Sequence, residues 1–392
     1  MSAFLPDLTS GAQSSRLLEM LNQAGARRVL REPAPDLGLA EHLPFPFLAM
    51  VGQLEMRMAL LLAVINPAIG GVLLIGPRGT GKTTCVRSLA DLLPYIEVSA
   101  CPEGCLPTDV DAKGNLDVCP DCQRKLAAGE SITRYEAVKL IELPLNARLE
   151  DVVGGINERI AVQQGRVRLE KGILARADQN LLYIDEVNLL DDLIVDAILD
   201  AAAQGSYTVR RGPMVGTYRS RFVLIGSMNP EEGRLRPQIM DRFGLRVWVQ
   251  GLTNVAERYE VYRRVRRYQA NKRRFLAEWA EVTAEAREEV ALARELLKQT
   301  ELSEEAVKVG LALVATLGID SHRAEYAMFE AARAYAAADG RDVAGVKDIR
   351  AVAPMALRQR RSEFMAEYFR QQSEEDAAIG QQLDALIRRV RP

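Results

Sequence analysis

The residues best suited to chemistry form a glycine-rich segment that ends in lysine and threonine. It follows the pattern G-x-x-x-x-G-K-[ST], and its members are Gly76, Pro77, Arg78, Gly79, Thr80, Gly81, Lys82 and Thr83, with Thr84 next. Glycines let the backbone N–H groups turn inward around a polyphosphate. The lysine can then reach the β- and γ-phosphates, and the threonine hydroxyl can ligate Mg²⁺. The segment therefore predicts a nucleotide site.

A second candidate group is the acidic pair Asp185 and Glu186, which follows the apolar run 181–184. This is a Walker B pattern. We expect Asp185 to hold the magnesium ion and Glu186 to polarise the attacking water. Another apolar run, 222–228, ends at Asn229, whose amide should lie beside the acidic pair at the carboxyl edge of the sheet.

Four cysteines form a third group. Cys101 and Cys105 make one pair, Cys119 and Cys122 make another, and a Gly114–Asn115 turn separates the pairs. Two such thiolate pairs can surround a structural zinc ion tetrahedrally. The alternative is a set of unmetallated, redox-sensitive thiols. The fifth cysteine, Cys85, is expected to be a buried residue of the helix after the glycine-rich segment.

These groups require a parallel sheet to position them. The short apolar stretch 71–75 predicts a buried strand before the glycine-rich segment, and a helical pattern follows until Pro94. Further elements are a helix over 54–65, a strand over 95–99, a helix over 187–204 and two hairpins. One hairpin belongs to the block 143–177, and the other brackets Gly212 and Gly216.

The chain divides into three parts in this interpretation. Residues 1–44 form a loosely attached extension. Residues 45–252 form an α/β core, with a Cys-rich insert at about 101–130 and a second insert at about 143–177. Residues 253–392 are helical, and helices begin near the following capping residues: Thr253 or Asn254, then Thr283, Ser303, Ser321 and Asp342. Gly318 and Gly340 are expected to stop helices.

Arg323 stands two residues after the cap Ser321, where a helix dipole disfavours a cation. The occurrence of a cation at this position is explained if its side chain faces a bound anion. The alternative is an exposed arginine tolerated at small cost.

Composition narrows the classes of function. The 392 residues carry a net charge of −2 and only two histidines, so neither a global basic field nor histidine catalysis is expected. No apolar run approaches the ~18 residues of a membrane span, and the first residues lack the regions of a signal peptide. Five cysteines without a signal suggest a reducing compartment, and we expect a cytoplasmic protein.

The glycine-rich segment, the acidic pair and Asn229, in this order, resemble the AAA+ ATPases. Longer strings are similar to one family within them, the small ATPase (I) subunit of magnesium chelatase. The matching strings are 45–47, 51–53, 70–73, 143–145, 172–177, 182–192, 228–233, 235–238 and 241–244. The Cys-rich insert departs from the family.

This resemblance implies a AAA+ core with a parallel sheet, an all-helical C-terminal lid, and ATP with Mg²⁺ as ligands. It implies that Asn229 is sensor 1, Arg242 the arginine finger and Arg323 the sensor 2 residue, and that 143–177 is the helix-2 insert. The short helical segment 235–240 would carry Arg242 away from its own phosphate loop, so we expect it to act on a neighbouring subunit. The alternative is a structural arginine paired with a nearby carboxylate.

The resemblance also implies a ring, expected to be a hexamer, that works with a D subunit and a porphyrin-binding H subunit to drive Mg²⁺ into protoporphyrin IX. One alternative is a related motor of the MoxR or cobalt-chelatase type that remodels a von Willebrand-type partner. Another is a nucleic-acid translocase, which the near-neutral charge argues against. We expect neither a nucleic-acid partner nor a membrane span.

Overall fold

The computed structural model describes residues 16–23, 43–101, 104–107, 118–156, 169–212 and 214–361, with scattered positions between 367 and 383. Most of the expected extension 1–44, the Gly114–Asn115 turn and the middle of the 143–177 insert lie outside the described residues.

The centre of the molecule is a five-stranded sheet in the order β11-β1-β10-β7-β4, and every neighbouring pair is parallel. Its strands are β1 (Val72–Ile75), β4 (Leu140–Leu143), β7 (Leu181–Ile184), β10 (Val223–Met228) and β11 (Leu245–Trp248). β1, β7 and β10 are buried along their whole length, because helices cover both faces. The predicted α/β core with a parallel sheet is confirmed.

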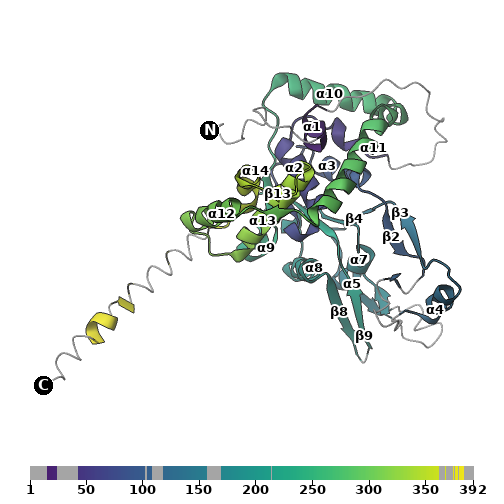
Figure 1. Ribbon diagram of the computed structural model, residues 1–392, viewed down its shortest axis with the longest axis horizontal. Coiled ribbons are helices and arrows are strands. Elements are labelled where there is room, and N and C mark those ends of the chain that lie inside the picture. The colour runs from purple at the N-terminus through teal and green to yellow at the C-terminus, as the bar shows by residue number, and fades with distance from the viewer. Residues whose placement is uncertain are drawn as a thin grey trace.

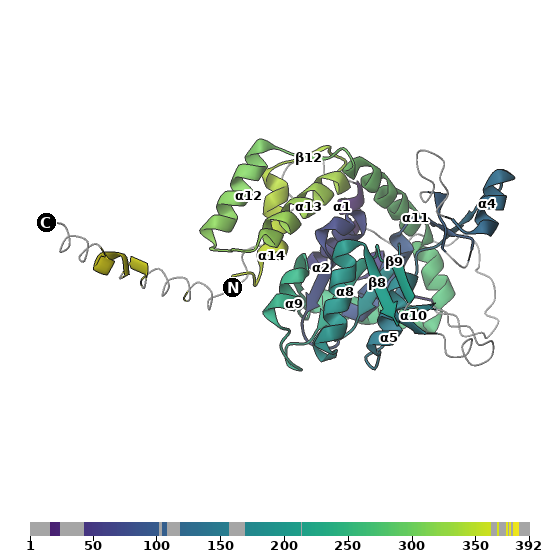
Figure 2. The same cartoon turned by 90° about the horizontal axis from the view of Figure 1, so that it is seen from below.

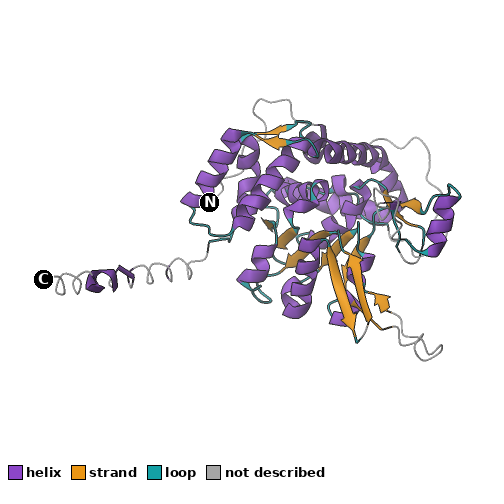
Figure 3. Cartoon of the chain, turned by 60° about the horizontal axis from the view of Figure 1, so that its bottom comes forward, coloured by secondary structure: helices purple, strands orange, loops and turns teal. Residues whose placement is uncertain are grey.

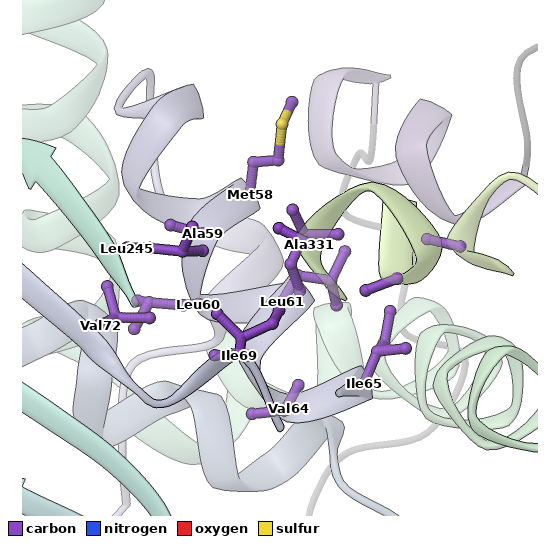
Figure 4. Close-up of a cluster of buried hydrophobic side chains, with 14 of the residues drawn as sticks. Met58, Ala59, Leu60, Leu61, Val64, Ile65, Ile69, Val72, Leu245 and Ala331 are labelled. Atoms are coloured by element: carbon purple, nitrogen blue, oxygen red, sulfur yellow. The ribbon is translucent and has the colours of Figure 1, made fainter. Parts of the chain in front are cut away.

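Helices pack on the two faces of this sheet. One face carries α2 (Leu54–Ile65) and α3 (Lys82–Leu89), and the other carries α8 (Asp192–Gln204) and α9 (Pro237–Arg242). Short 3-10 turns, η1 (Phe47–Ala49), η2 (Pro67–Ile69), η3 (Ala90–Leu92) and η5 (Val187–Leu189), connect them. Because α2 is apolar all round, it is buried between layers. Figure 4 shows Leu60 next to Val72 and Leu245 on one side of α2 and Leu61 next to Ala331 on the other.

Several small elements stand outside the central sheet. The predicted strand over 95–99 forms as β2 (Ile96–Ser99), but it pairs antiparallel with β3 (Thr133–Glu136) in a separate ribbon. Helix α4 (Pro120–Ala127) lies beyond this ribbon, at the end of the molecule opposite the C-terminal helices α12–α14 (Figures 1 and 2).

Both predicted hairpins are present. The first has β5 (Gly154–Ile156) and β6 (Leu169–Lys171), preceded by α5 (Leu149–Val153) and followed by the short helix α7 (Ile173–Arg176). The second, β8 (Ser206–Arg211) with β9 (Met214–Arg219), projects from the core (Figure 3). Instead of one helix over 187–204, η5 is followed by α8, because Asp191 caps the Leu193 N–H and restarts the helix.

The C-terminal part is mostly helical. Its elements are α10 (Val255–Ala270), α11 (Lys272–Leu297), α12 (Glu304–Thr316), α13 (His322–Ala338) and α14 (Val346–Leu357). It is not all-helical, since β12 (Glu301–Leu302) pairs in parallel with β13 (Val343–Ala344).

The predicted helix starts near Asn254, Ser303 and Ser321 are confirmed, and Gly318 and Gly340 follow helices with positive φ. The predicted start at Thr283 is wrong. Asn271 caps the Arg274 N–H, and α11 then runs through Thr283 without a break. The start at Asp342 is also wrong, because residues 343–344 join the short sheet before α14 begins.

One described piece of the expected extension is not loosely attached. Helix α1 (Arg16–Gln23) buries Leu17 and Leu21 in the core beside α2 and α11. The long helices of the described residues are too polar, and the apolar ones too short, to cross a bilayer.

Candidate functional site

The phosphate loop lies between β1 and α3 at the carboxyl edge of the sheet. Gly76 is required by close packing, because a Cβ there would lie 2.0 Å from the carbonyl oxygen of Val249. Gly81 is required by backbone geometry, since it precedes α3 with φ at +89°. Lys82 is the first residue of α3, so the loop opens directly onto a helix N-terminus, where backbone N–H groups favour anions.

The Lys82 ammonium group is held inside the loop. Its Nζ donates to the carbonyl oxygens of Gly76, at 2.6 Å, and Pro77, at 2.8 Å. Burial lowers the pKa of Lys82, and three carboxylates, those of Asp185, Glu186 and Glu232, oppose that shift. The buried Lys82 cation therefore lies in the field of three anions.

Asp185 is fixed by a ring of hydroxyl groups. Its carboxylate accepts hydrogen bonds from Tyr183, at 2.8 Å, from Thr83, at 3.4 Å, and from Ser227. Burial, aided by the adjacent Asp185, raises the pKa of Tyr183, so the phenol stays neutral and donates. Thr83 Oγ1 and Asp185 are thus adjacent, and together they can hold a magnesium ion.

Glu186 is presented from a backbone with φ at +53°, and its N–H donates to Ser227 Oγ. The Arg78 guanidinium reaches it across the loop, with Nη2 3.1 Å from Glu186 Oε1, and also pairs with Glu232. Our interpretation of the sequence assigned Glu232 no role. It lies on the turn after β10, within the matching string 228–233.

Asn229 lies between the phosphate loop and the acidic pair, because β10 is hydrogen-bonded to both β1 and β7. It is buried, and its Oδ1 accepts from the Glu231 N–H at 3.3 Å. A cavity of about 240 Å³ is lined by the acidic pair, by Asn229 and by all the predicted loop residues except Gly76 and Pro77. Its walls are Arg78, Gly79, Thr80, Gly81, Lys82, Thr83, Thr84, Asp185, Glu186 and Asn229, with Ser227 and Met228.

A more apolar cavity of about 440 Å³ shares Gly79, Thr80, Gly81 and Thr84 with the first. Its further walls include Phe45 and Met50 from the segment before α2, and Val261 and Val265 from α10. This size and lining suit a flat aromatic base attached to the bound phosphates. Sequence reasoning missed these residues, since their only signal is apolar character.

Arg242 and Arg323 do not line either cavity. Arg242 Nη1 lies 2.5 Å from Asp200 Oδ1 and 3.7 Å from Asp196 Oδ1, both on α8. The side chain of Arg323 is 60% exposed. Its Nη1 lies 3.7 Å from Oδ2 of Asp241, the residue immediately before Arg242. The two arginines therefore belong to one region of the surface.

Asp241 links that region to the C-terminal helices. Ser321, the residue before α13, donates to its Oδ2 at 2.9 Å, so Ser321 marks the helix start without capping it through its hydroxyl. Arg360 Nη1 donates to Asp241 Oδ1 at 2.7 Å, and its Nη2 donates to the carbonyl oxygens of Phe243 and Gly244. Arg246, which is almost fully buried, adds bonds to Met240, Arg358 and Gln359.

The four predicted cysteines come together at the end of the molecule that carries α4. Their sulfur atoms all lie within 4.8 Å of one another. A tetrahedral ion with metal–sulfur bonds of about 2.3 Å requires sulfur atoms about 3.8 Å apart, so the set fits a single metal ion. Two backbone N–H groups point at sulfur, those of Cys105 and Cys119.

The thiols of the cluster differ in acidity, and burial raises the pKa of Cys105 and of Cys122. Burial by itself would raise the pKa of Cys101, but hydrogen bonds from Ser99, the Cys105 N–H and neighbouring thiols outweigh it and lower the pKa to about 6. A thiolate is the form that binds metal. Cys85 lies apart and is fully buried in α3, as expected.

The fold and the site define a AAA+ ATPase: a phosphate loop, an acidic strand end and a buried asparagine on adjacent parallel strands, followed by a helical region. Residues 311–382 match the AAA lid domain family. The chain is 45% identical over 322 residues to a magnesium-chelatase subunit ChlI homolog of Methanocaldococcus jannaschii, covering 82% of this chain and 87% of that one. The chain belongs to the family of the magnesium chelatase I subunit.

Two further comparisons agree. The magnesium-chelatase 38 kDa subunit of Rhodobacter capsulatus is 43% identical over 317 residues, which cover 81% of this chain and 87% of that subunit. A crystal structure of a putative ATPase from Cytophaga hutchinsonii superposes with a TM-score of 0.52 at 22% identity, covering 81% of this chain and 86% of the other. That structure supports the fold.

Proposed function

We propose that this protein is the ATP-hydrolysing motor subunit of a magnesium chelatase, and that it drives the insertion of Mg²⁺ into protoporphyrin IX. The observation that carries the proposal is the single cavity in which Lys82, Thr83, Asp185, Glu186 and Asn229 meet in a chain of this family. The partners are an ATPase-like D subunit and a porphyrin-binding H subunit.

In this mechanism the phosphate loop binds the polyphosphate of ATP through its backbone N–H groups, and Lys82 moves from its loop carbonyls to the phosphates. Thr83 and Asp185 hold Mg²⁺. Glu186 accepts a proton from the attacking water, and the Asn229 amide orients that water. Residues 45–252 act as the core, and residues 253–392 act as the lid.

We propose further that the active unit is a ring, a hexamer, in which Arg242 and Arg323 complete the site of a neighbour. Their absence from the walls of the cavities of their own chain supports this assignment. The pairing of Arg242 with Asp196 and Asp200 would then be its resting position in the free subunit.

We also propose that Cys101, Cys105, Cys119 and Cys122 bind a structural zinc ion. Support comes from the spacing of the sulfur atoms and from the residues of the surrounding core. Among the residues that the structure describes in this part of the chain, that core buries Cys105, Val118, Cys122 and Ile132. Two of these four are candidate metal ligands, so a bound ion would crosslink the segment that they belong to. Reduced thiols and a bound zinc fit a cytoplasmic protein.

The test of the chelatase assignment is reconstitution with purified D and H subunits, Mg²⁺, ATP and protoporphyrin IX, followed by the absorption of the metallated porphyrin. Insertion of Mg²⁺ should require both this chain and ATP, and the Lys82→Ala variant should not support insertion in place of the unmodified chain. ATP hydrolysis that continues without any metal insertion, in the presence of active D and H subunits, would contradict the assignment. DNA-stimulated hydrolysis would instead favour a translocase.

A further inference from the structure

Arg78, a residue of the phosphate loop, binds two carboxylates: that of Glu186, which lines the cavity, and that of Glu232, on the turn after β10. Its Nη2 lies 3.1 Å from Glu186 Oε1, and the same nitrogen pairs with Glu232 Oε1. The expected general base is therefore engaged by a cation that belongs to the phosphate-binding loop.

The two carboxylates are the fixed members of this contact. Glu186 is held through its N–H to Ser227 Oγ, and the Glu232 N–H donates to the Asn229 carbonyl at 3.1 Å in a tight turn. Their side chains are 23% and 20% exposed, whereas that of Arg78 is 70% exposed. The arginine is the long and solvated partner, so it is the member that can move.

The charges around Arg78 indicate where its side chain would move. Three carboxylates, those of Asp185, Glu186 and Glu232, act on the Lys82 ammonium group, and Glu186 and Glu232 also pair with Arg78. A γ-phosphate offers Arg78 several oxygens for charge-assisted, bidentate hydrogen bonds. Glu232 competes for the same guanidinium. Among the residues that the structure describes, nothing donates to its other oxygen, Oε2.

We propose that Arg78 and Glu232 are positioning residues. Glu232 helps to hold Arg78 in its ion pair with Glu186 until a γ-phosphate binds. When the γ-phosphate attracts Arg78, Glu186 loses its cation and becomes available to the attacking water. ADP lacks that group, so Arg78 returns to the carboxylates after hydrolysis. This inference rests on the proposed hydrolysis of ATP at this site.

The test uses Glu232→Gln, which keeps the size of the side chain and removes its charge. Binding of the Mg²⁺ complexes of a non-hydrolysable ATP analogue and of ADP is measured by calorimetry. Because an exposed ion pair contributes at most about 1 kcal/mol, the analogue should bind about twofold to fivefold more tightly, and ADP should bind as before.

A double-mutant cycle separates this effect from the general loss of a negative charge near phosphates. In an Arg78→Ala background the gain in affinity from Glu232→Gln should disappear, because Glu232 and the γ-phosphate then have no Arg78 side chain for which to compete. A gain that persists without Arg78, or an equal gain for ADP, would overturn the proposal. Arg134→Ala is the matched control: Arg134 is 63% exposed and pairs with Glu136, far from the cavity.

Failure of the proposed function would look different. Lys82→Ala should weaken binding of both nucleotides whatever the role of Arg78. If Lys82→Ala bound both as tightly as the unmodified protein, the nucleotide site itself would be misassigned. Thermal unfolding of each variant establishes that the comparison is made between folded proteins.

Discussion

Arg323, from the first turn of α13, lies beside Asp241, the residue immediately before Arg242, with 3.7 Å between Nη1 and Oδ2. The lid and the proposed finger segment of one subunit are therefore joined at a single carboxylate, which also binds Ser321 and Arg360. Both arginines are held at one surface, away from the nucleotide cavities of their own chain.

Mixed rings should recover activity when the two defects lie in different subunits. Arg242→Ala removes the finger and leaves the base, whereas Glu186→Gln removes the base and leaves the finger. Each variant should be nearly inactive alone, since a finger in trans contributes ~10³-fold or more in other phosphoryl-transfer enzymes. Mixing should partly restore ATPase activity in a concentration-dependent way. No recovery in rings shown to contain both subunits would contradict action in trans.

A second mixture tests whether Arg323 acts on the same neighbour as Arg242. Rings of Arg242→Ala and Arg323→Ala subunits should stay inactive, because no subunit supplies both arginines. If Arg323 served its own site, an Arg242→Ala subunit next to an intact finger would be complete, and activity would return. Mixing Arg323→Ala with Glu186→Gln is the positive control and should recover.

Glu186→Gln should keep Mg·ATP binding and lose at least ~10²-fold in turnover, because the amide cannot accept a proton from water. Nucleotide binding is followed by calorimetry and hydrolysis by phosphate release. Native turnover in this variant would mean that Glu186 is not the base.

The cysteine cluster should carry about one zinc ion per chain when the protein is purified under reducing conditions. X-ray absorption should find four sulfur ligands at about 2.3 Å. Cys101→Ala should lose the metal, whereas Cys85→Ala, a change at a buried cysteine outside the cluster, should keep it. Metal-free protein with four freely reactive thiols would exclude structural zinc.

Arg360→Ala should destabilise the protein by about 2–4 kcal/mol, because it leaves the buried carbonyl groups of Phe243 and Gly244 without their donor. Urea unfolding measures the change in the free energy of unfolding. Arg361→Ala, at the exposed next position, should change it by less than about 0.5 kcal/mol. Equal effects of the two changes would show that the carbonyl contacts contribute little.

The edge of the sheet that carries the candidate site was predictable because each of its parts is local. The phosphate loop and the acidic pair follow apolar strands directly, and parallel strands bring their carboxyl ends to one edge. Asn229 was predicted on the same ground. The position of β10 between β1 and β7 then places these groups in one cavity.

The features of the site and the fold that were not predicted depend on contacts between segments that are distant in the sequence. Glu232 meets Arg78 only through the turn after β10, and nothing in either neighbourhood predicts the contact. Arg360 finds its carbonyl partners more than a hundred positions away along the chain. The start predicted at Thr283 was wrong because α11 begins at Lys272, where Asn271 caps the Arg274 N–H, and runs through Thr283 without a break.

Helix α10 contains no buried residue along its sixteen positions, yet it forms one wall of the apolar cavity beside the phosphate loop. Val261 and Val265 line this cavity, whereas Tyr268, near the end of the helix, packs against Phe45 and Phe275. A nucleobase seated in the cavity would add apolar contact to the two valines. Part of the apolar packing of α10 would then be present only while a nucleotide is bound. Amide hydrogen exchange along α10 should slow when either ATP or ADP is bound, because both carry the same base.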